Sequence, residues 1–123
     1  MAGQPINVTG SVVTPTFDPL KPYWQDAKDA IDVTGYRGAR FDFGLKVYTL
    51  AGTSPSLTVK LYSSMYHDDD GDVWDLLGAF SAVTTSNTAC TLSVSSGMLR
   101  YVRWKLEYTN MTLVTLEILG MVW

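Results

Sequence analysis

The strongest constraint on the fold of this chain is the alternation of apolar and polar residues in three separate segments. Residues 41–47, 57–61 and 100–108 each carry a large apolar side chain at every second position. Because successive side chains of a β-strand point to opposite faces of the sheet, this period gives each segment one apolar face. Three such segments predict a sheet that packs against a core.

Polar turn signals fall between the predicted strands. Residues 52–55 (GTSP) follow the first strand and residues 68–72 (DDDGD) follow the second. Further polar stretches at residues 86–88, 95–97 and 109–110 leave strands at residues 74–84, 89–94, 99–108 and 113–123. Strands joined by short turns pair antiparallel, and we expect the last two to close the domain as a pair. The predicted fold is all-β, an antiparallel two-sheet β-sandwich of jelly-roll-like character.

The N-terminal region differs from the rest of the chain. Four of the five prolines precede residue 23, and the stretch FDPLKP at residues 17–22 cannot form a regular strand. An edge strand at residues 6–13 and one or two helical turns at residues 24–31 are compatible with the sequence. We therefore predict an irregular N-terminal arm, residues 1–29, on a β-sandwich domain, residues 30–123. The arm either wraps its own sandwich or attaches to a neighbouring molecule.

Composition limits the classes of partner. The chain has 123 residues and a net charge of −3 at pH 7, and it lacks the basic patch that a nucleic-acid partner requires. No apolar run is long enough for a membrane helix, and the first ten residues lack the pattern of a secretory signal. These features predict synthesis in the cytoplasm and no membrane partner. The single cysteine, Cys90, is expected to be a small core residue.

The acidic stretch after His67 is the segment with the clearest chemical potential. Asp68, Asp70 and Asp72 alternate around a glycine, and several carboxylates on a flexible loop suit calcium. The full EF-hand pattern is absent, and Asp and Gly are also preferred in solvated hairpin turns. A calcium site and a plain turn are the two alternatives.

Catalytic motifs are missing from the sequence. No nucleophile elbow, phosphate loop or CxxC pair occurs, and His67 is the only histidine. Asp26, Asp29 and Asp32 are spaced three apart, but we interpret them as a solvated face beside Lys28 rather than as a catalytic pair. We predict no enzymatic activity and no cofactor apart from the calcium alternative.

Aromatic and basic residues at outward positions are the candidates for protein contacts. Trp104 shares its strand face with two aliphatic residues and is predicted to be core. Tyrosine and arginine are enriched at interfaces, because they supply contact area and hydrogen bonds together. The predicted contact residues are Tyr48, Tyr62, Tyr101, Arg103 and Trp123.

The last predicted strand is apolar on both sides. Leu113, Leu119, Met121 and Trp123 lie on the side opposite the core-facing residues. An apolar outer face predicts a cover, which is either the N-terminal arm or another subunit.

Four stretches carry a family resemblance: residues 32–38 (DVTGYRG), residues 52–59 (GTSPSLTV), Trp74 with residues 77–80 (LGAF), and residues 99–104 (LRYVRW). Together they resemble small β-sandwich virion proteins of tailed bacteriophages and prophages, such as capsid decoration or cement proteins and head–tail or tail accessory proteins. The resemblance spans about residues 30–123. It implies a virion location after synthesis in the bacterial host, capsid or other virion proteins as partners, a homo-oligomer, and no catalytic residues.

Two other classes compete with a virion structural protein. Residues 99–103 (LRYVR) also look like a strand of discoidin-like carbohydrate-binding sandwiches. The aromatic residues and the possible calcium loop would suit such a glycan-binding module. A host-encoded adaptor domain is the third class.

Overall fold

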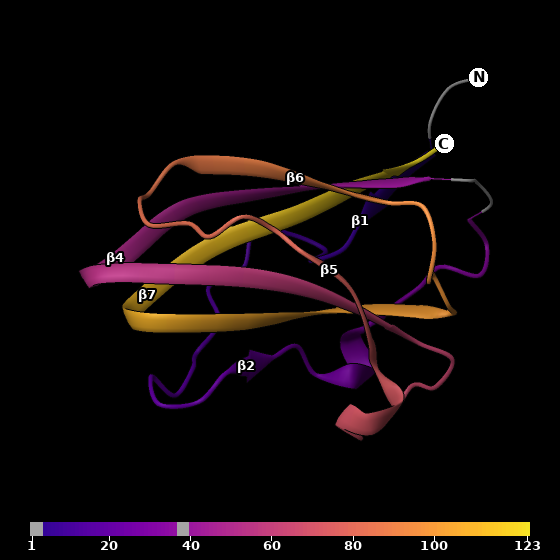
Figure 1. Ribbon diagram of the computed structural model, residues 1–123, viewed down its shortest axis with the longest axis horizontal. Helices are drawn as coiled ribbons and strands as arrows, with labels where there is room; N and C mark the ends of the chain where they lie inside the picture. Colours follow the sequence, from indigo (N-terminus) through magenta and orange to yellow (C-terminus); the bar gives the residue numbers. More distant parts are fainter. Residues whose placement is uncertain (1–3, 37–39) are drawn as a thin grey trace.

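The computed structural model describes residues 4–36 and 40–123 and shows a nearly all-β chain with 59% of its residues in strands. These strands form a curled antiparallel sheet, so the all-β prediction is confirmed (Figure 1). The elements are β1 (Gln4–Asn7), β2 (Tyr23–Trp24), η1 (Ala27–Asp29), β3 (Ile31–Asp32), β4 (Phe41–Ser64), η2 (Gly71–Val73), β5 (Asp75–Ala79), β6 (Thr88–Val94) and β7 (Tyr101–Val122). Arg37 and Gly38, which end the first resemblance motif, lie outside the described residues.

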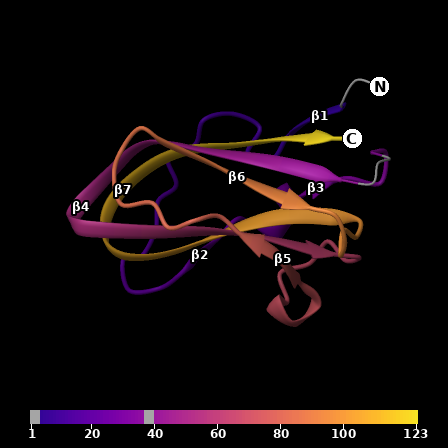
Figure 2. The ribbon, with the colours of Figure 1, turned by 45° about the horizontal axis from the view of Figure 1, so that its top comes forward.

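The long strands β4 and β7 form the centre of the sheet. They pair antiparallel from Phe41 opposite Val122 to Ser64 opposite Tyr101. The prediction that residues 99–108 and 113–123 pair with each other is wrong, because both are halves of β7 and each pairs with β4. Residues 52–55 and 109–110 are likewise not strand-ending turns. They are corners at which the paired strands bend together (Figures 1 and 2).

Special backbone conformations produce this corner. Gly52, Ser54 and Asn110 all have positive φ angles, of 145°, 49° and 54°. The register shifts on both sides of Gly52, which marks β-bulges that bend the ribbon. A Cβ on Gly52 would lie only 1.8 Å from the Asn110 carbonyl oxygen, so glycine is required there.

The remaining strands extend the sheet on both sides. β6 pairs with the first half of β4, and β5 pairs with its second half. On the other side, β1, β2 and β3 pair with successive parts of β7. The described N-terminal residues therefore follow the free edge of β7 and wrap their own sheet. Within the predicted helical stretch only the three-residue turn η1 forms, with Asp26 as its N-cap.

One hydrophobic core fills the inside of the curl. Phe43 and Leu61 of β4 and Trp104 and Ile118 of β7 are buried in the same cluster. Both halves of the two long strands therefore contribute to one core, which stabilises the bend by burying apolar surface from both sides. The prediction that Trp104 is a core residue is confirmed. In the described part of the chain, no helix is long and apolar enough to span a membrane.

Candidate functional site

A groove of about 590 Å³ opens at the free edge of β7. We call it the edge groove. One wall consists of residues 7–10 and 13–15, at the end of β1 and after it, and the other consists of residues between the start of β2 and β3. Trp104 of β7 also lines it. The groove thus lies where the N-terminal segment passes from one half of the curled sheet to the other.

Aromatic side chains line the inner part of the edge groove. Tyr23 stacks on Trp104 with a ring-centroid distance of 5.5 Å. Trp104 is only 4% exposed, and its indole Nε1 has no hydrogen-bond partner among the described residues. A buried donor without a partner is costly, so this N–H is an unsatisfied group beside the groove.

Gln25 fixes the wall of the groove against the sheet. Its backbone N–H donates to the Trp104 carbonyl at 3.0 Å, and its side-chain oxygen accepts from the Trp104 backbone N–H at 3.3 Å. Its side-chain amide donates to the Asp29 carbonyl at 3.0 Å. A single buried side chain therefore joins β7 to η1, which positions the aspartates of η1 relative to Trp104.

The rim of the groove is acidic. Asp26 and Asp29 line it, and among residues 4–36 and 40–123 no basic residue lines the groove. Burial raises the pKa of Tyr23, and the nearby carboxylates of Asp29 and Asp26 raise it further. Lys28 forms an ion pair with Asp26 at 3.7 Å, but both side chains are largely exposed, so this pair is weak.

Arg103 lies on the outer side of β7, as the alternation predicts, but other segments of the chain cover it and it does not face solvent. It is 3% exposed, with its guanidinium 4.2 Å from the ring centroid of Trp24 and 4.9 Å from that of Trp74. Asp69 lies 3.7 Å from its Nη1. Burial lowers the pKa of Arg103, while the carboxylates of Asp69 and Asp26 act in the opposite direction. We call Arg103, Trp24 and Trp74 the arginine clamp.

Two of the predicted contact tyrosines lie beside this clamp. Tyr62 is half-buried with its ring centroid 4.6 Å from that of Trp24. Tyr101 is half-buried and stacks on the exposed His67 at 4.5 Å. Sequence alternation correctly placed Tyr101 and Arg103 on the outer side of β7, but it could not show that the N-terminal segment and the residue 65–74 loop cover that side.

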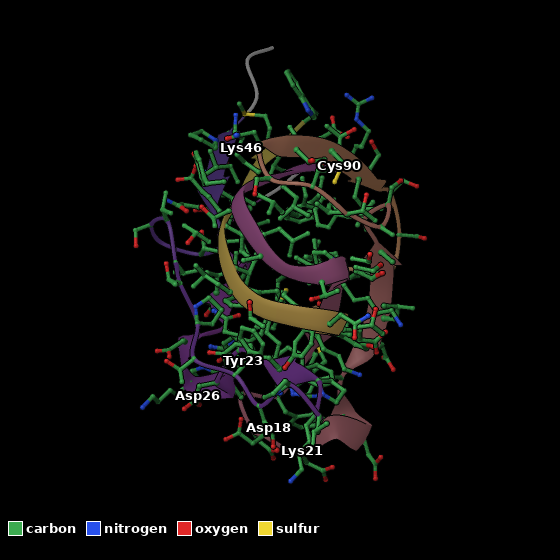
Figure 3. The ribbon with its side chains drawn as sticks, turned by 90° about the vertical axis from the view of Figure 1, so that its left-hand side faces the viewer. Asp18, Lys21, Tyr23, Asp26, Lys46 and Cys90 are labelled. Atoms are coloured by element: carbon green, nitrogen blue, oxygen red, sulfur yellow. The ribbon has the colours of Figure 1, made fainter. Side chains whose placement is uncertain are left out.

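The other predicted contact residues lie on an uncovered part of the sheet. The outward side chains of β6, the first half of β4 and the second half of β7 form what we call the open face. Tyr48 is exposed there and donates a hydrogen bond to Glu117 at 3.1 Å. Trp123 is also exposed and lies under the guanidinium of Arg40 at 5.8 Å. Figure 3 shows Lys46 of the open face in the upper part of the molecule and Tyr23 in the lower part.

A shallow hollow of about 320 Å³ marks the centre of the open face. It forms at Gly44, where an added Cβ would meet no atom within 4 Å. Leu119 borders it at 45% exposure, and Leu113 further along β7 is 43% exposed. The apolar outer face expected for this strand is therefore present, and the N-terminal segment leaves these leucines exposed. Cys90 also borders the hollow, is half-buried against the core, and has its thiol pKa raised by burial.

The acidic loop forms a turn. Asp68 accepts a hydrogen bond from the Asp70 N–H at 2.7 Å, and Asp70 accepts one from the Asp72 N–H at 3.0 Å. Across residues 4–36 and 40–123, no three acidic, histidine or cysteine side chains gather in a geometry that could hold a metal ion. Asp69, which the metal prediction did not include, has a structural contact instead, because it accepts the Ala27 N–H at 3.0 Å.

No known family model matches this sequence, and no curated protein matches it significantly. Function must therefore be inferred from the edge groove, the open face and the residue patterns. Sequence reasoning identified Asp26, Asp29 and Trp104 individually but did not place them together. Tyr23 and Gln25 were missed, since only the pairing of β2 with β7 brings them to Trp104.

Proposed function

We propose that this chain is a non-enzymatic structural protein of a tailed-bacteriophage virion, a capsid decoration or cement protein that attaches through its open face. A tail or neck accessory protein is the variant of this proposal, and both would be made in the host cytoplasm and assembled into the virion. In this proposal the two halves of the curled sheet constitute a jelly-roll-like two-sheet sandwich. The sequence resemblance supports the virion class, and the open face supports the mode of action.

The exposed leucines of β7 are the observation that carries the proposal. Leu113 and Leu119 are exposed on β7 in the centre of the sheet, and Leu119 borders the hollow at Gly44. Tyr48 adds an aromatic side chain of the type that is enriched in interfaces. Exposed apolar side chains on the same face as a hollow are typical of a protein-binding surface.

Lys46 and Glu117 give this face polar specificity as well as apolar area. They occupy paired positions on β4 and β7 and border the same hollow. A neighbouring virion protein with a projecting apolar side chain and complementary charges would fit the face. One such contact is weak, but contacts repeated over a symmetric lattice give durable attachment. The same logic makes a homo-oligomer around a symmetry axis the expected form.

Incorporation into particles tests the proposal. The Leu119→Lys variant should lose occupancy on purified phage particles by about tenfold or more, because a charge replaces an apolar side chain at the centre of the contact. Leu76→Lys is the matched control: Leu76 is 55% exposed on β5, away from the open face, and its replacement should leave occupancy unchanged. Quantitative immunogold labelling measures both, with circular dichroism to verify folding.

Two results would refute the proposal. One is a strictly monomeric protein that is absent from purified particles. The other is an equal occupancy of the Leu119→Lys and Leu76→Lys variants, which would show that attachment does not use the open face.

A further inference from the structure

We propose that the edge groove is a binding site for a neutral sugar ring. This goes beyond the proposed assembly function and uses a different part of the molecule, since the groove lies along the N-terminal segment and the open face lies over β4, β6 and β7. Three properties of the groove lead to the sugar: its hydrogen-bonding groups, its apolar lining and its rigidity.

The hydrogen-bonding groups require a ligand that both donates and accepts. The carboxylates of Asp26 and Asp29 on the rim can only accept hydrogen bonds when ionised. The unpartnered indole N–H of Trp104 can only donate. A sugar hydroxyl does both, so neighbouring hydroxyls of one ring can serve the carboxylates and the indole together. A quaternary ammonium ion would suit the acidic rim but has no acceptor for the indole.

The lining suits the apolar face of a sugar ring. Val8 and Ile31 contribute aliphatic surface, and Tyr23 and Trp104 contribute aromatic surface. The volume of about 590 Å³ lies within the range of small-molecule sites, which combine an apolar lining with a few placed polar groups. Thr9 and Asn7 on the opposite wall are engaged within the chain, because Thr9 accepts the Ile118 N–H and the Asn7 amide bonds to Gly10.

Local hydrogen bonds hold the polar groups of the groove in place before any ligand binds. Gln25 bonds to the backbone of Trp104 on one side and to the Asp29 carbonyl on the other. Asp26 caps η1 by accepting the Lys28 N–H at 3.2 Å. Binding a sugar would therefore order few additional side chains, which lowers the entropic cost of binding.

Indole resonances in ¹H–¹⁵N NMR spectra provide a direct test. The probes are glucose, galactose, mannose, rhamnose, N-acetylglucosamine and N-acetylgalactosamine, each as the free sugar and as its methyl glycoside. We expect at least one to shift the Trp104 indole resonance in a saturable manner, with the resonance assigned from Trp104→Phe. Binding of both forms of a sugar indicates a site for the end of a glycan chain, whereas binding of the free form alone indicates a free sugar.

Carboxylate variants then assign the binding to the groove. Asp26→Asn and Asp29→Asn should each weaken binding about tenfold, because a charged acceptor is replaced by a neutral one. Asparagine also caps helical turns, so Asp26→Asn should fold. Asp29 is exposed at the end of η1, so Asp29→Asn should fold as well. Asp75→Asn, on exposed β5, is the control and should bind as the unmodified protein does.

Three results would overturn the proposal: no sugar shifts the Trp104 resonance, the shift persists unchanged in both groove variants, or tetramethylammonium chloride saturates the site while the sugars do not. None of these results depends on particle incorporation, so the sugar site and the assembly function fail or stand separately.

Discussion

The two halves of β7 have opposite surroundings. In the first half the outward residues are polar, yet Trp24 of the N-terminal segment covers Arg103 and Lys105, and Trp74 also covers Arg103. In the second half the outward residues include Leu113 and Leu119, yet they remain exposed. Along β7, therefore, other segments of the chain cover polar outward residues and leave apolar outward residues exposed to solvent.

Cation–π contacts explain why the polar half is covered. The guanidinium of Arg103 lies against Trp24 and Trp74, and the Lys105 ammonium lies 4.8 Å from the Trp24 ring centroid. A desolvated cation is stabilised by aromatic faces, so tryptophans from two distant segments can hold the N-terminal segment on a charged strand. In the described part of the chain no such contact covers the apolar half, and its leucines are exposed.

The largest effect is expected at the corner that separates the two halves. Gly52→Ala should lower the free energy of unfolding by about 3–5 kcal/mol, because the new Cβ would collide with the Asn110 carbonyl and the positive φ disfavours alanine. Urea unfolding monitored by tryptophan fluorescence measures the change. Gly44→Ala is the control in the same strand and should change stability by less than about 0.5 kcal/mol, since its Cβ meets nothing. Equal effects would show that the corner tolerates a side chain.

Removing Arg103 from the arginine clamp tests whether the clamp holds the N-terminal segment on the first half of β7. Arg103→Ala should lower the free energy of unfolding by about 3 kcal/mol, because two cation–π contacts and the packing of a buried side chain are lost together. We also expect faster hydrogen exchange at Gln25 and Ala27, whose hydrogen bonds hold the segment in place. Lys46→Ala on the open face is the control and should change neither. Unchanged exchange in Arg103→Ala would mean that the clamp does not hold the N-terminal segment.

Protonation of Glu107 at low pH should lower the free energy of unfolding, because it removes ion pairs on the first half of β7. Hydrogen bonds from Lys60 and Lys105, at 2.6 Å and 2.9 Å, hold the pKa of Glu107 below its usual value. Since the folded pKa is the lower one, this stabilisation is present above the unfolded pKa and is lost as the pH falls through the folded pKa. Glu107→Gln should lower the free energy of unfolding by about 1 kcal/mol at neutral pH. The effect is modest because solvent screens the ion pairs of this partly exposed group.

Denaturant unfolding at a series of pH values measures the Glu107 contribution. The difference between Glu107→Gln and the unmodified protein should shrink as the solution becomes acidic. A difference that stays constant with pH would assign the effect of the variant to packing instead.

Local sequence patterns predicted the strands but not the connections between them. The alternation in residues 41–47, 57–61 and 100–108 correctly predicted strands because it reflects one buried face. Residues 52–55 and 109–110 contain residues typical of turns, and positive φ angles at Gly52 and Asn110 are needed there. A bent strand and a hairpin turn require the same local conformations, so only the long-range pairing of β4 with β7 distinguishes them.

The two candidate sites also differ in how far sequence could predict them. The apolar outer residues of the open face follow from the period of a single strand, so Leu119 was recognisable. The edge groove assembles residues from segments far apart in the chain, and no spacing rule relates Tyr23 to Trp104. For the same reason Arg103 looked exposed, because the tryptophans that cover it come from other segments.

The smallest effect on stability is expected at Leu119. Leu116 and Leu119 belong to the same half of β7, but Leu116 is fully buried and Leu119 is 45% exposed. Leu116→Ala should cost about 3 kcal/mol through the cavity it leaves, whereas Leu119→Ala should change the free energy of unfolding by less than about 0.5 kcal/mol. If Leu119→Ala is neutral for folding but lowers particle occupancy, the leucine serves attachment rather than stability. A cost near that of Leu116→Ala would instead make the open face part of the folded core.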